Sequence, residues 1–137
     1  MTLRIVSAEP LNAEAPLAAL YEPITPVESF YVRNNFSMPD IDAGRWSLRV
    51  HGRVRSPLAL DLAKIRTLPR VTKRVTLECA GNGRRLMSPT PAGTAWELGA
   101  AGTAMFTGTP LREVLSLCTP ESDAVDCVFT GADGGNV

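Results

Sequence analysis

Hydrophobic and polar positions change their spacing several times along the chain, and each spacing predicts a different local structure. The longest alternating run covers residues 71–79, where most odd positions are apolar and the even positions are polar. A period of two predicts a half-buried β-strand. Shorter runs at 46–50 and 58–60 predict two more strands, the first of them ended by Gly52. Residues 126–130 predict a further short strand.

Two short helices are predicted from capping signals and from apolar side chains spaced by three and four residues. Asp61 is placed to cap a helix of one to two turns that runs to about Leu68 and is stopped by Pro69. Thr109 is the expected cap of the second helix, with Pro110 at its first position. The apolar face of this second helix consists of Leu111, Val114, Leu115 and Cys118.

Two long stretches show neither the two-residue period of a strand nor the helical spacing of three and four residues. Residues 1–29 are rich in Pro, Ala and Glu and predict an extended, mostly irregular N-terminal arm. Residues 86–109 contain several glycines without clean periodicity and predict a long loop, a type of segment that is disproportionately functional. Because strands and helices follow one another without regular βαβ alternation or internal repeats, the predicted fold class is α+β.

Composition narrows the functional classes. The chain has 14 basic and 14 acidic side chains, and this balance gives no reason to expect a nucleic-acid partner. No apolar stretch approaches the roughly 18 residues of a membrane span, so we expect no membrane insertion. The N-terminus shows neither a twin-arginine pair nor a hydrophobic signal core, and the three cysteines share no metal-type spacing. These features predict reduced thiols and a cytoplasmic protein.

The strand predicted at 71–79 ends in Cys79, and a glycine-rich turn at 80–83 and two arginines follow it. The glycines allow positive φ angles and a close approach of the backbone to a ligand. A soft thiolate beside open N–H groups and positive charge suits a metal or anion site, although a lone cysteine on an apolar face is by default structural. A simple hairpin turn at 82–83 is disfavoured because the residues after it do not alternate.

The spacing of Cys79 and Arg85 also fits the loop of cysteine-dependent phosphatases, in which a thiolate of low pKa attacks phosphate. Glu78 argues against this function, because a neighbouring carboxylate raises the pKa of a thiol. Leu86 stands where a Ser or Thr would assist the leaving thiolate. Two prolines shortly after it block the helix that such a loop should enter.

Residues 79–85 resemble the signature of the sulfite oxidase family of molybdopterin-dependent oxidoreductases, in which Cys-Ala-Gly-Asn is followed by one or two arginines. Three further segments resemble the same family in the same order. Phe30–Phe36 is similar to its Phe-x-Val-Arg-Asn-His segment, Trp96–Leu111 to its Trp-x-x-Gly-Ala run, and Phe129–Asp133 to its Phe-x-Gly-x-Asp turn. Four ordered matches are far more specific than any one of them.

The resemblance implies the α+β, mixed-sheet molybdopterin-binding fold of the sulfite oxidases, with residues 30–137 as its N-terminal part and residues 1–29 as an arm. The chain stops in a predicted turn at 131–137. Proteins of the family continue beyond such a segment and usually carry an immunoglobulin-like dimerisation domain. We therefore expect an incomplete fold, no activity of this chain alone, and a longer parent protein that is a candidate homodimer.

The resemblance also implies a molybdenum–molybdopterin cofactor. Cys79 would be the thiolate ligand of molybdenum, a metal that binds thiolates well in high oxidation states. Arg33 and Arg84 match arginines of the family's substrate pocket, where guanidinium groups hold an oxyanion. The residues expected to bind the cofactor are Tyr31, Val32, Arg33, Asn34, Asn35, Cys79 and Asp133.

Three positions depart from the family pattern. Asn35 replaces the usual His, Gly83 stands where the animal and plant enzymes have the first of two arginines, and Phe106 replaces a pocket Trp. The substrate class therefore stays broad: the expected reaction is oxo transfer to or from a small oxyanion or a sulfoxide-type compound, with an unidentified redox partner. A cofactor-free structural or interaction fragment is the alternative from another functional class.

Overall fold

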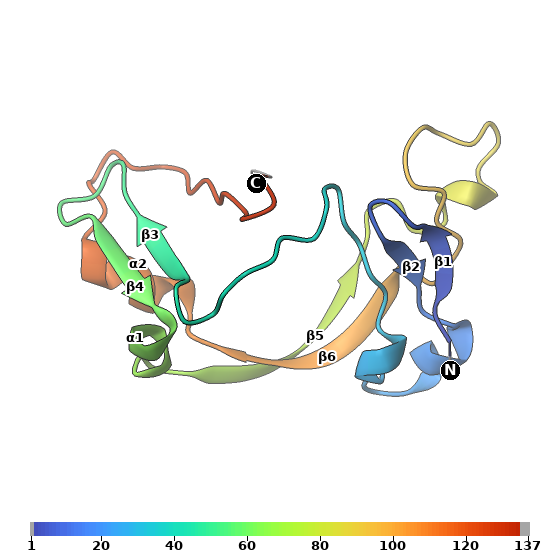
Figure 1. Cartoon of the computed structure of the whole chain (residues 1–137), viewed down its shortest axis with the longest axis horizontal. Helices are drawn as coiled ribbons and strands as arrows, with labels where there is room; N and C mark the ends of the chain where they lie inside the picture. Colours follow the sequence, from blue (N-terminus) through green and yellow to red (C-terminus); the bar gives the residue numbers. More distant parts are fainter. Residues whose placement is uncertain (1, 135–137) are drawn as a thin grey trace. The chain divides into compact units, whose positions relative to one another are not determined.

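The computed structural model describes residues 2–134, which form two-stranded sheets, short α-helices and 3-10 turns (Figure 1). The strands are β1 (Arg4–Ser7), β2 (Asn12–Glu14), β3 (Ser47–Val50), β4 (Leu58–Asp61), β5 (Val71–Glu78) and β6 (Ala101–Gly108). The helices are α1 (Leu62–Arg66) and α2 (Leu111–Cys118), and the 3-10 turns are η1 (Leu17–Tyr21), η2 (Val27–Ser29) and η3 (Arg84–Leu86). This content agrees with the α+β class, while the mixed sheet stays a prediction.

The chain divides into two compact units. One contains the residues up to Met38 together with Lys73–Phe106, and the other contains Pro39–Thr72 together with the residues from Thr107 onward. The N-terminal residues therefore belong to the same unit as Cys79. The predicted division into an arm at 1–29 and a domain portion at 30–137 stays a prediction, and the last three residues of the predicted turn at 131–137 lie outside the described residues.

The N-terminal residues are more regular than the predicted arm. β1 and β2 pair antiparallel, with Arg4 opposite Glu14 and an irregularity in register before Ser7. Ala13 of β2 also forms an isolated bridge with Val32. A three-residue strand is too short to show a period of two, so the sequence pattern could not reveal it. The buried apolar side chains of this unit are Ala13, Ala15, Ala19, Trp96 and Ala100.

β5 and β6 form a two-stranded sheet that carries Cys79 at one end. The hydroxyl of Thr72 bonds to that of Thr107, and the hydroxyl of Thr76 to that of Thr103, each at 2.8 Å. Because the partner number falls as the β5 number rises, the pairing is antiparallel. β5 confirms the predicted strand, whereas the predicted loop at 86–109 is wrong from the start of β6 onward.

The second unit confirms most of the predicted elements. β3 pairs antiparallel with β4 from Ser47 opposite Asp61 to Val50 opposite Leu58. The Asp61 carboxylate accepts a hydrogen bond from the Lys64 backbone N–H at 2.7 Å, so it caps α1 as predicted. This helix ends at Arg66, before the predicted end near residue 68.

Two local predictions for the second unit are wrong. Pro110, not Thr109, occupies the N-cap position of α2, and the Thr109 hydroxyl points instead to the Ile65 carbonyl oxygen at 3.4 Å. Val114 and Cys118 are buried, as the helical spacing predicted, whereas Leu111 of the same predicted face is exposed. Residues 126–130 form no strand, and within this stretch only Thr130 takes part in a β-bridge.

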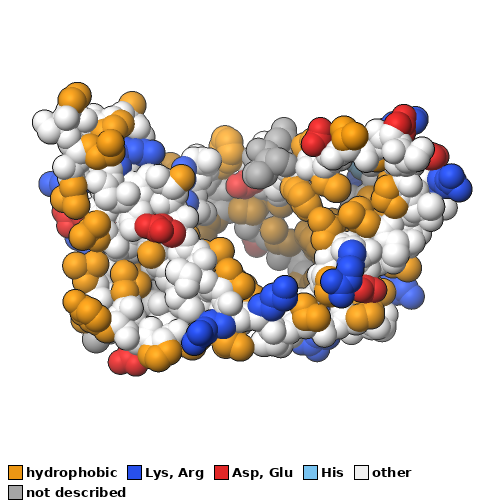
Figure 2. Space-filling model, turned by 180° about the vertical axis from the view of Figure 1, so that it is seen from behind, with side chains coloured by type: hydrophobic (Ala, Val, Ile, Leu, Met, Phe, Trp, Pro, Cys, Tyr) orange, Lys and Arg blue, Asp and Glu red, His pale blue; other side chains and the backbone are white. Residues whose placement is uncertain are grey.

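Large apolar side chains are widely exposed on the described surface (Figure 2). Tyr21, Val27 and Val125 are each 88% exposed, and Met38 is 66% exposed. Packing within the described residues therefore rests mainly on Trp96, on small side chains and on hydrogen bonds. No α-helix in the described part of the chain has both the length and the apolar character required to cross a membrane.

Candidate active site

Cys79 lies directly after the last residue of β5, and its side chain is partly exposed. Its backbone N–H donates to the Ala100 carbonyl at 2.9 Å, which extends the pairing of β5 and β6 by one residue. Its carbonyl accepts from the Asn82 backbone N–H at 2.8 Å, which closes the following turn. The thiol forms no disulfide. Both peptide groups are thus held, and the residue stays partly exposed.

The turn after Cys79 requires glycine at one point, and a second glycine makes room for a neighbouring side chain. Gly83 has a φ of 80°, a left-handed conformation that other residues adopt only with strain. The described turn uses positive φ only at this glycine, so that prediction holds for Gly83 and not for Gly81. A Cβ on Gly81 would lie 2.8 Å from the guanidinium carbon of Arg84, so the end of that side chain would have to shift.

The Arg84 guanidinium lies against the backbone of two glycines. A Cβ built on Gly93 would approach its Nη1 atom to 2.3 Å, and one built on Gly81 would approach its Nη2 atom to 2.8 Å. The same Nη1 atom donates to the Thr94 carbonyl at 3.2 Å. Arg84 therefore ties the turn after Cys79 to the loop at 93–94, and its predicted role in anion binding stays a prediction.

The segment from Tyr31 to Asn35 is anchored to the N-terminal hairpin. Val32 exchanges backbone hydrogen bonds of 2.8 and 2.9 Å with Ala13. The Asn34 backbone N–H donates to Oδ1 of the buried Asn12 at 2.9 Å, and the Asn34 side chain donates to the Leu11 carbonyl at 2.7 Å. Sequence reasoning missed the role of Asn12 because a predicted irregular arm offered no partner for it.

Arg33 is exposed at the centre of this segment. Its guanidinium donates hydrogen bonds to the Asn34 carbonyl and to Oδ1 of Asn35. Both acceptors are neutral, so these contacts orient the guanidinium without neutralising its charge. The arrangement presents a preoriented positive group, which is the property an oxyanion site requires.

The Tyr31 phenol lies within electrostatic range of Cys79. Burial raises the pKa of the Tyr31 phenol above its usual value, and the negative charges of Cys79 and Glu78 raise it further. The phenol therefore keeps its proton at neutral pH and is a hydrogen-bond donor. The Tyr31 ring stacks on Phe30 with 5.4 Å between centroids, and Phe30 in turn packs on Gly102 of β6, where a Cβ would lie 2.7 Å from its ring.

The buried carboxylate of Glu14 is linked to the turn after Cys79 through the backbone of residues 96–97. Glu14 is 2% exposed, pairs with Arg4 and accepts the Glu97 backbone N–H. The Glu97 carbonyl accepts from Gly83, and the neighbouring Trp96 carbonyl accepts from Arg85 at 2.9 Å. The charge of Glu14 thereby connects the N-terminal hairpin to the turn after Cys79. No pattern in the sequence indicated this connection.

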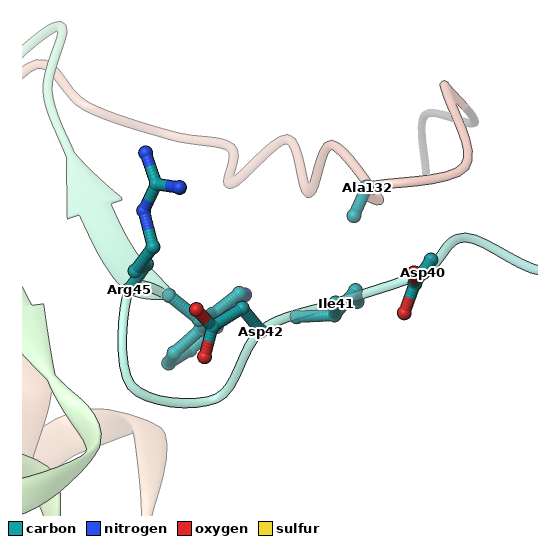
Figure 3. Close-up of a pocket in the computed structure, with 6 residues that line it drawn as sticks. Asp40, Ile41, Asp42, Arg45 and Ala132 are labelled. Atoms are coloured by element: carbon teal, nitrogen blue, oxygen red, sulfur yellow. The ribbon is translucent and has the colours of Figure 1, made fainter.

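Cys79 lines neither of two hollows in the described structure. One, of about 220 Å³, belongs to the first unit and is lined by Arg4, Glu14, Ala15, Pro16, Leu17, Leu86, Glu97, Leu98 and Gly99. The other lies in the second unit between the turn at 40–46 and Ala132 (Figure 3). No group of three or more His, Cys, Asp or Glu side chains within residues 2–134 is arranged to hold a metal.

The first unit brings most predicted site residues into one compact body: Tyr31, Val32, Arg33, Asn34, Asn35, Cys79 and Arg84. Asp133 belongs to the second unit, next to the Ala132 that lines the hollow of Figure 3. Its predicted contact with the cofactor therefore stays a prediction.

A solved structure shares the fold of this chain. The sulfane dehydrogenase SoxCD from Paracoccus pantotrophus superposes with a TM-score of 0.77 at 22% sequence identity, covering 88% of this chain and 33% of that one.

Relatives of higher identity are longer enzymes. Sulfite oxidase from Gallus gallus is 40% identical over 117 residues, covering 82% of this chain and 26% of its own length. Sulfite oxidase from Arabidopsis thaliana is 38% identical over 120 residues, with coverages of 85% and 30%. The NADPH nitrate reductase of Emericella nidulans is 34% identical over 139 residues, with coverages of 96% and 16%. The chain thus spans less than a third of the length of these relatives.

A family model, described as the oxidoreductase molybdopterin binding domain, matches residues 35–136. Together with the sulfite oxidase relatives, this match implies a molybdenum–molybdopterin cofactor. The chain belongs to the family of oxidoreductase molybdopterin-binding domains, as its resemblance to the sulfite oxidases predicted.

Proposed function

We propose that this chain supplies the thiolate side of the active site in a molybdenum-dependent oxidoreductase of the sulfite oxidase type. The reaction is oxo transfer to or from a small oxyanion or a sulfoxide-type substrate. The observation that carries the proposal is Cys79 itself, partly exposed, outside any disulfide and held at a strand end by backbone hydrogen bonds, in a chain of this family. We place the parent protein in the cytoplasm.

The residues present fit the cofactor by the chemistry of their donors. A thiolate is the protein ligand that suits molybdenum, and Cys79 offers its sulfur outside any disulfide. The segment from Tyr31 to Asn35 offers a phenol donor, amide groups and backbone groups on a support fixed by Ala13 and Asn12. When bound, the cofactor supplies the two-electron oxo-transfer chemistry.

The protein's own groups bind the substrate and orient the thiolate. Arg33 holds the negative charge of an oxyanion through a guanidinium that Asn34 and Asn35 already orient. Tyr31 donates a hydrogen bond from a phenol that burial and nearby negative charge keep protonated. The turn at 80–83 and the strand β6 hold the Cys79 peptide, so the thiolate is positioned before any ligand arrives.

Replacing Arg33 with methionine should raise KM for an anionic substrate by about tenfold and change kcat less, because the charged contact acts mainly in binding. Steady-state kinetics with the cofactor-loaded parent protein measure both constants. Arg74→Met is the matched control, because Arg74 lies on the face of β5 opposite to that of Cys79. Equal KM values for Arg33→Met and the wild type would reject this role.

The function as a whole is tested with purified parent protein from a host that makes the cofactor. Oxidation of sulfite and reduction of nitrate or of a simple sulfoxide are followed with a dye as electron acceptor or donor. We expect turnover of at least one of these substrates. Absence of all three activities in a molybdenum-loaded protein would contradict the proposed substrate class.

A cofactor-free structural or interaction fragment is the second candidate. The wide exposure of large apolar side chains favours contacts with additional protein, as in Val27 and Val125. Under either function we expect the 137-residue chain alone to be inactive. Molybdenum retention distinguishes the two candidates: only the oxidoreductase retains the metal when it is made in the presence of the cofactor.

A further inference from the structure

Asn82 occupies the place where the pairing of β5 and β6 ends. Residues directly opposite in an antiparallel pair of this type exchange two bonds, N–H to C=O in each direction. The register of Thr72 with Thr107 and of Thr76 with Thr103 puts Cys79 opposite Ala100. One of the two expected bonds is present, from the Cys79 N–H to the Ala100 carbonyl at 2.9 Å.

Asn82 replaces the second bond with two of its own. Its backbone N–H donates to the Cys79 carbonyl at 2.8 Å, and its side-chain Oδ1 accepts the Ala100 N–H at 3.0 Å. Cys79, Asn82 and Ala100 therefore form a closed cycle of three hydrogen bonds. The cycle satisfies both peptide groups of Cys79 and directs the chain out of the sheet immediately after it.

The nitrogen of the Asn82 side-chain amide also makes a hydrogen bond. This Nδ2 atom donates to Oε1 of Glu78 at 2.9 Å. The two bonds assign the amide unambiguously, because the oxygen faces a backbone donor and the nitrogen faces a carboxylate. Asn82 thus links the residue before Cys79 to the residue opposite it.

We propose that Asn82 is a positioning residue that holds the Cys79 peptide at the end of β5 and thereby aims its thiolate at the metal. The inference rests on the proposed function, in which Cys79 is the molybdenum ligand. Asparagine suits the position because it combines an acceptor for Ala100 with a donor for Glu78. A longer Gln would displace the acceptor, and Ala would leave the Ala100 N–H without its partner.

Asn82→Ala is the removing variant, and the double variant Asn82→Asp with Glu78→Gln is the rescuing one. In the double variant the new carboxylate accepts from Ala100, and the amide introduced at position 78 donates to that carboxylate. The three hydrogen bonds of the cycle are kept, and donor and acceptor exchange places only in the bond between residues 78 and 82. Thr76→Val is the matched control, since it removes one side-chain hydrogen bond of β5 without touching the cycle.

Two readouts on the cofactor-loaded parent protein are needed. Hydrogen exchange at the Ala100 amide should accelerate about tenfold in Asn82→Ala and stay within about threefold of the wild type in the double variant and in Thr76→Val. X-ray absorption at the molybdenum edge should show, at equal metal content, loss of the sulfur contribution that Cys79→Ala also removes. The double variant should retain this contribution.

Unchanged exchange and an unchanged sulfur contribution in Asn82→Ala would overturn the proposal. Faster exchange with an unchanged sulfur contribution would also overturn it, because Asn82 would then support the turn without directing the thiolate. If the double variant behaves like Asn82→Ala, loss of the hydrogen-bonded cycle does not cause the faster exchange or the lost sulfur contribution, and the proposal is also overturned. Wild-type protein without molybdenum would refute the proposed function instead, and the exchange measurement would then decide alone whether Asn82 holds Cys79.

Discussion

Replacing Cys79 with serine is expected to lower kcat of the cofactor-loaded parent protein by about a hundredfold or more, since loss of a ligand should exceed the effect of disturbing its support. A serine oxygen is a harder donor than a thiolate sulfur, so it does not reproduce the electronic properties of a sulfur ligand on molybdenum. The measurement is kcat on a substrate that the wild type turns over, with metal content determined for each preparation.

Cys127→Ser is the matched control for this prediction. Cys127 is exposed, forms no disulfide and belongs to the other compact unit, so its replacement should leave kcat unchanged. Wild-type kcat in a molybdenum-loaded Cys79→Ser protein would remove Cys79 from the reaction. Equal losses in both variants would point to general damage by serine substitution rather than to a ligand.

Gly99→Ala is expected to reduce the free energy of unfolding by about 2–4 kcal/mol. A Cβ at this position would lie 2.3 Å from the Ala15 carbonyl oxygen and 2.9 Å from Cβ of Glu14. Neither neighbour is the end of a flexible side chain, so the backbone itself must move. The movement would lengthen the hydrogen bond from the Ala15 N–H to the Gly99 carbonyl, which now measures 2.9 Å.

Gly108→Ala provides the comparison for Gly99→Ala. No atom lies within 4 Å of a Cβ at Gly108, and its φ is not in the left-handed region. Urea denaturation of both variants, compared with the wild type, gives the two differences in free energy. Gly108→Ala should stay within about 0.5 kcal/mol of the wild type. An equally small effect of Gly99→Ala would mean that the N-terminal hairpin does not pack on this glycine as described.

The long alternating run could be predicted as a strand because its pattern needs no knowledge of a partner. β6 could not, since Gly102 and its small neighbours interrupt the alternation. The identity of β6 as a strand depends on pairing with β5, and its glycine is explained only by the Phe30 ring that covers it. Tertiary contacts override local preference in such segments.

In the candidate site, too, some residues could be predicted from the sequence and others depend on tertiary contacts. Cys79 and Arg33 could be found from motif resemblance, whereas the backbone contacts that hold Cys79 emerged only from the structure. Glu14 and Asn12 support the site from a segment without a readable pattern. A buried carboxylate is tolerated only with partners, and those partners are Arg4 and a backbone N–H more than eighty residues away in the chain.

Molybdenum content tests most directly whether the protein is a molybdenum-dependent oxidoreductase that holds its metal with the help of Cys79. The parent protein and its Cys79→Ala variant are produced in a host that makes the cofactor, and metal per polypeptide is determined by elemental mass spectrometry. We expect close to one molybdenum per wild-type chain and a lower content in the variant. Wild-type protein without molybdenum, from a host that loads another molybdenum enzyme fully, would contradict the proposed function.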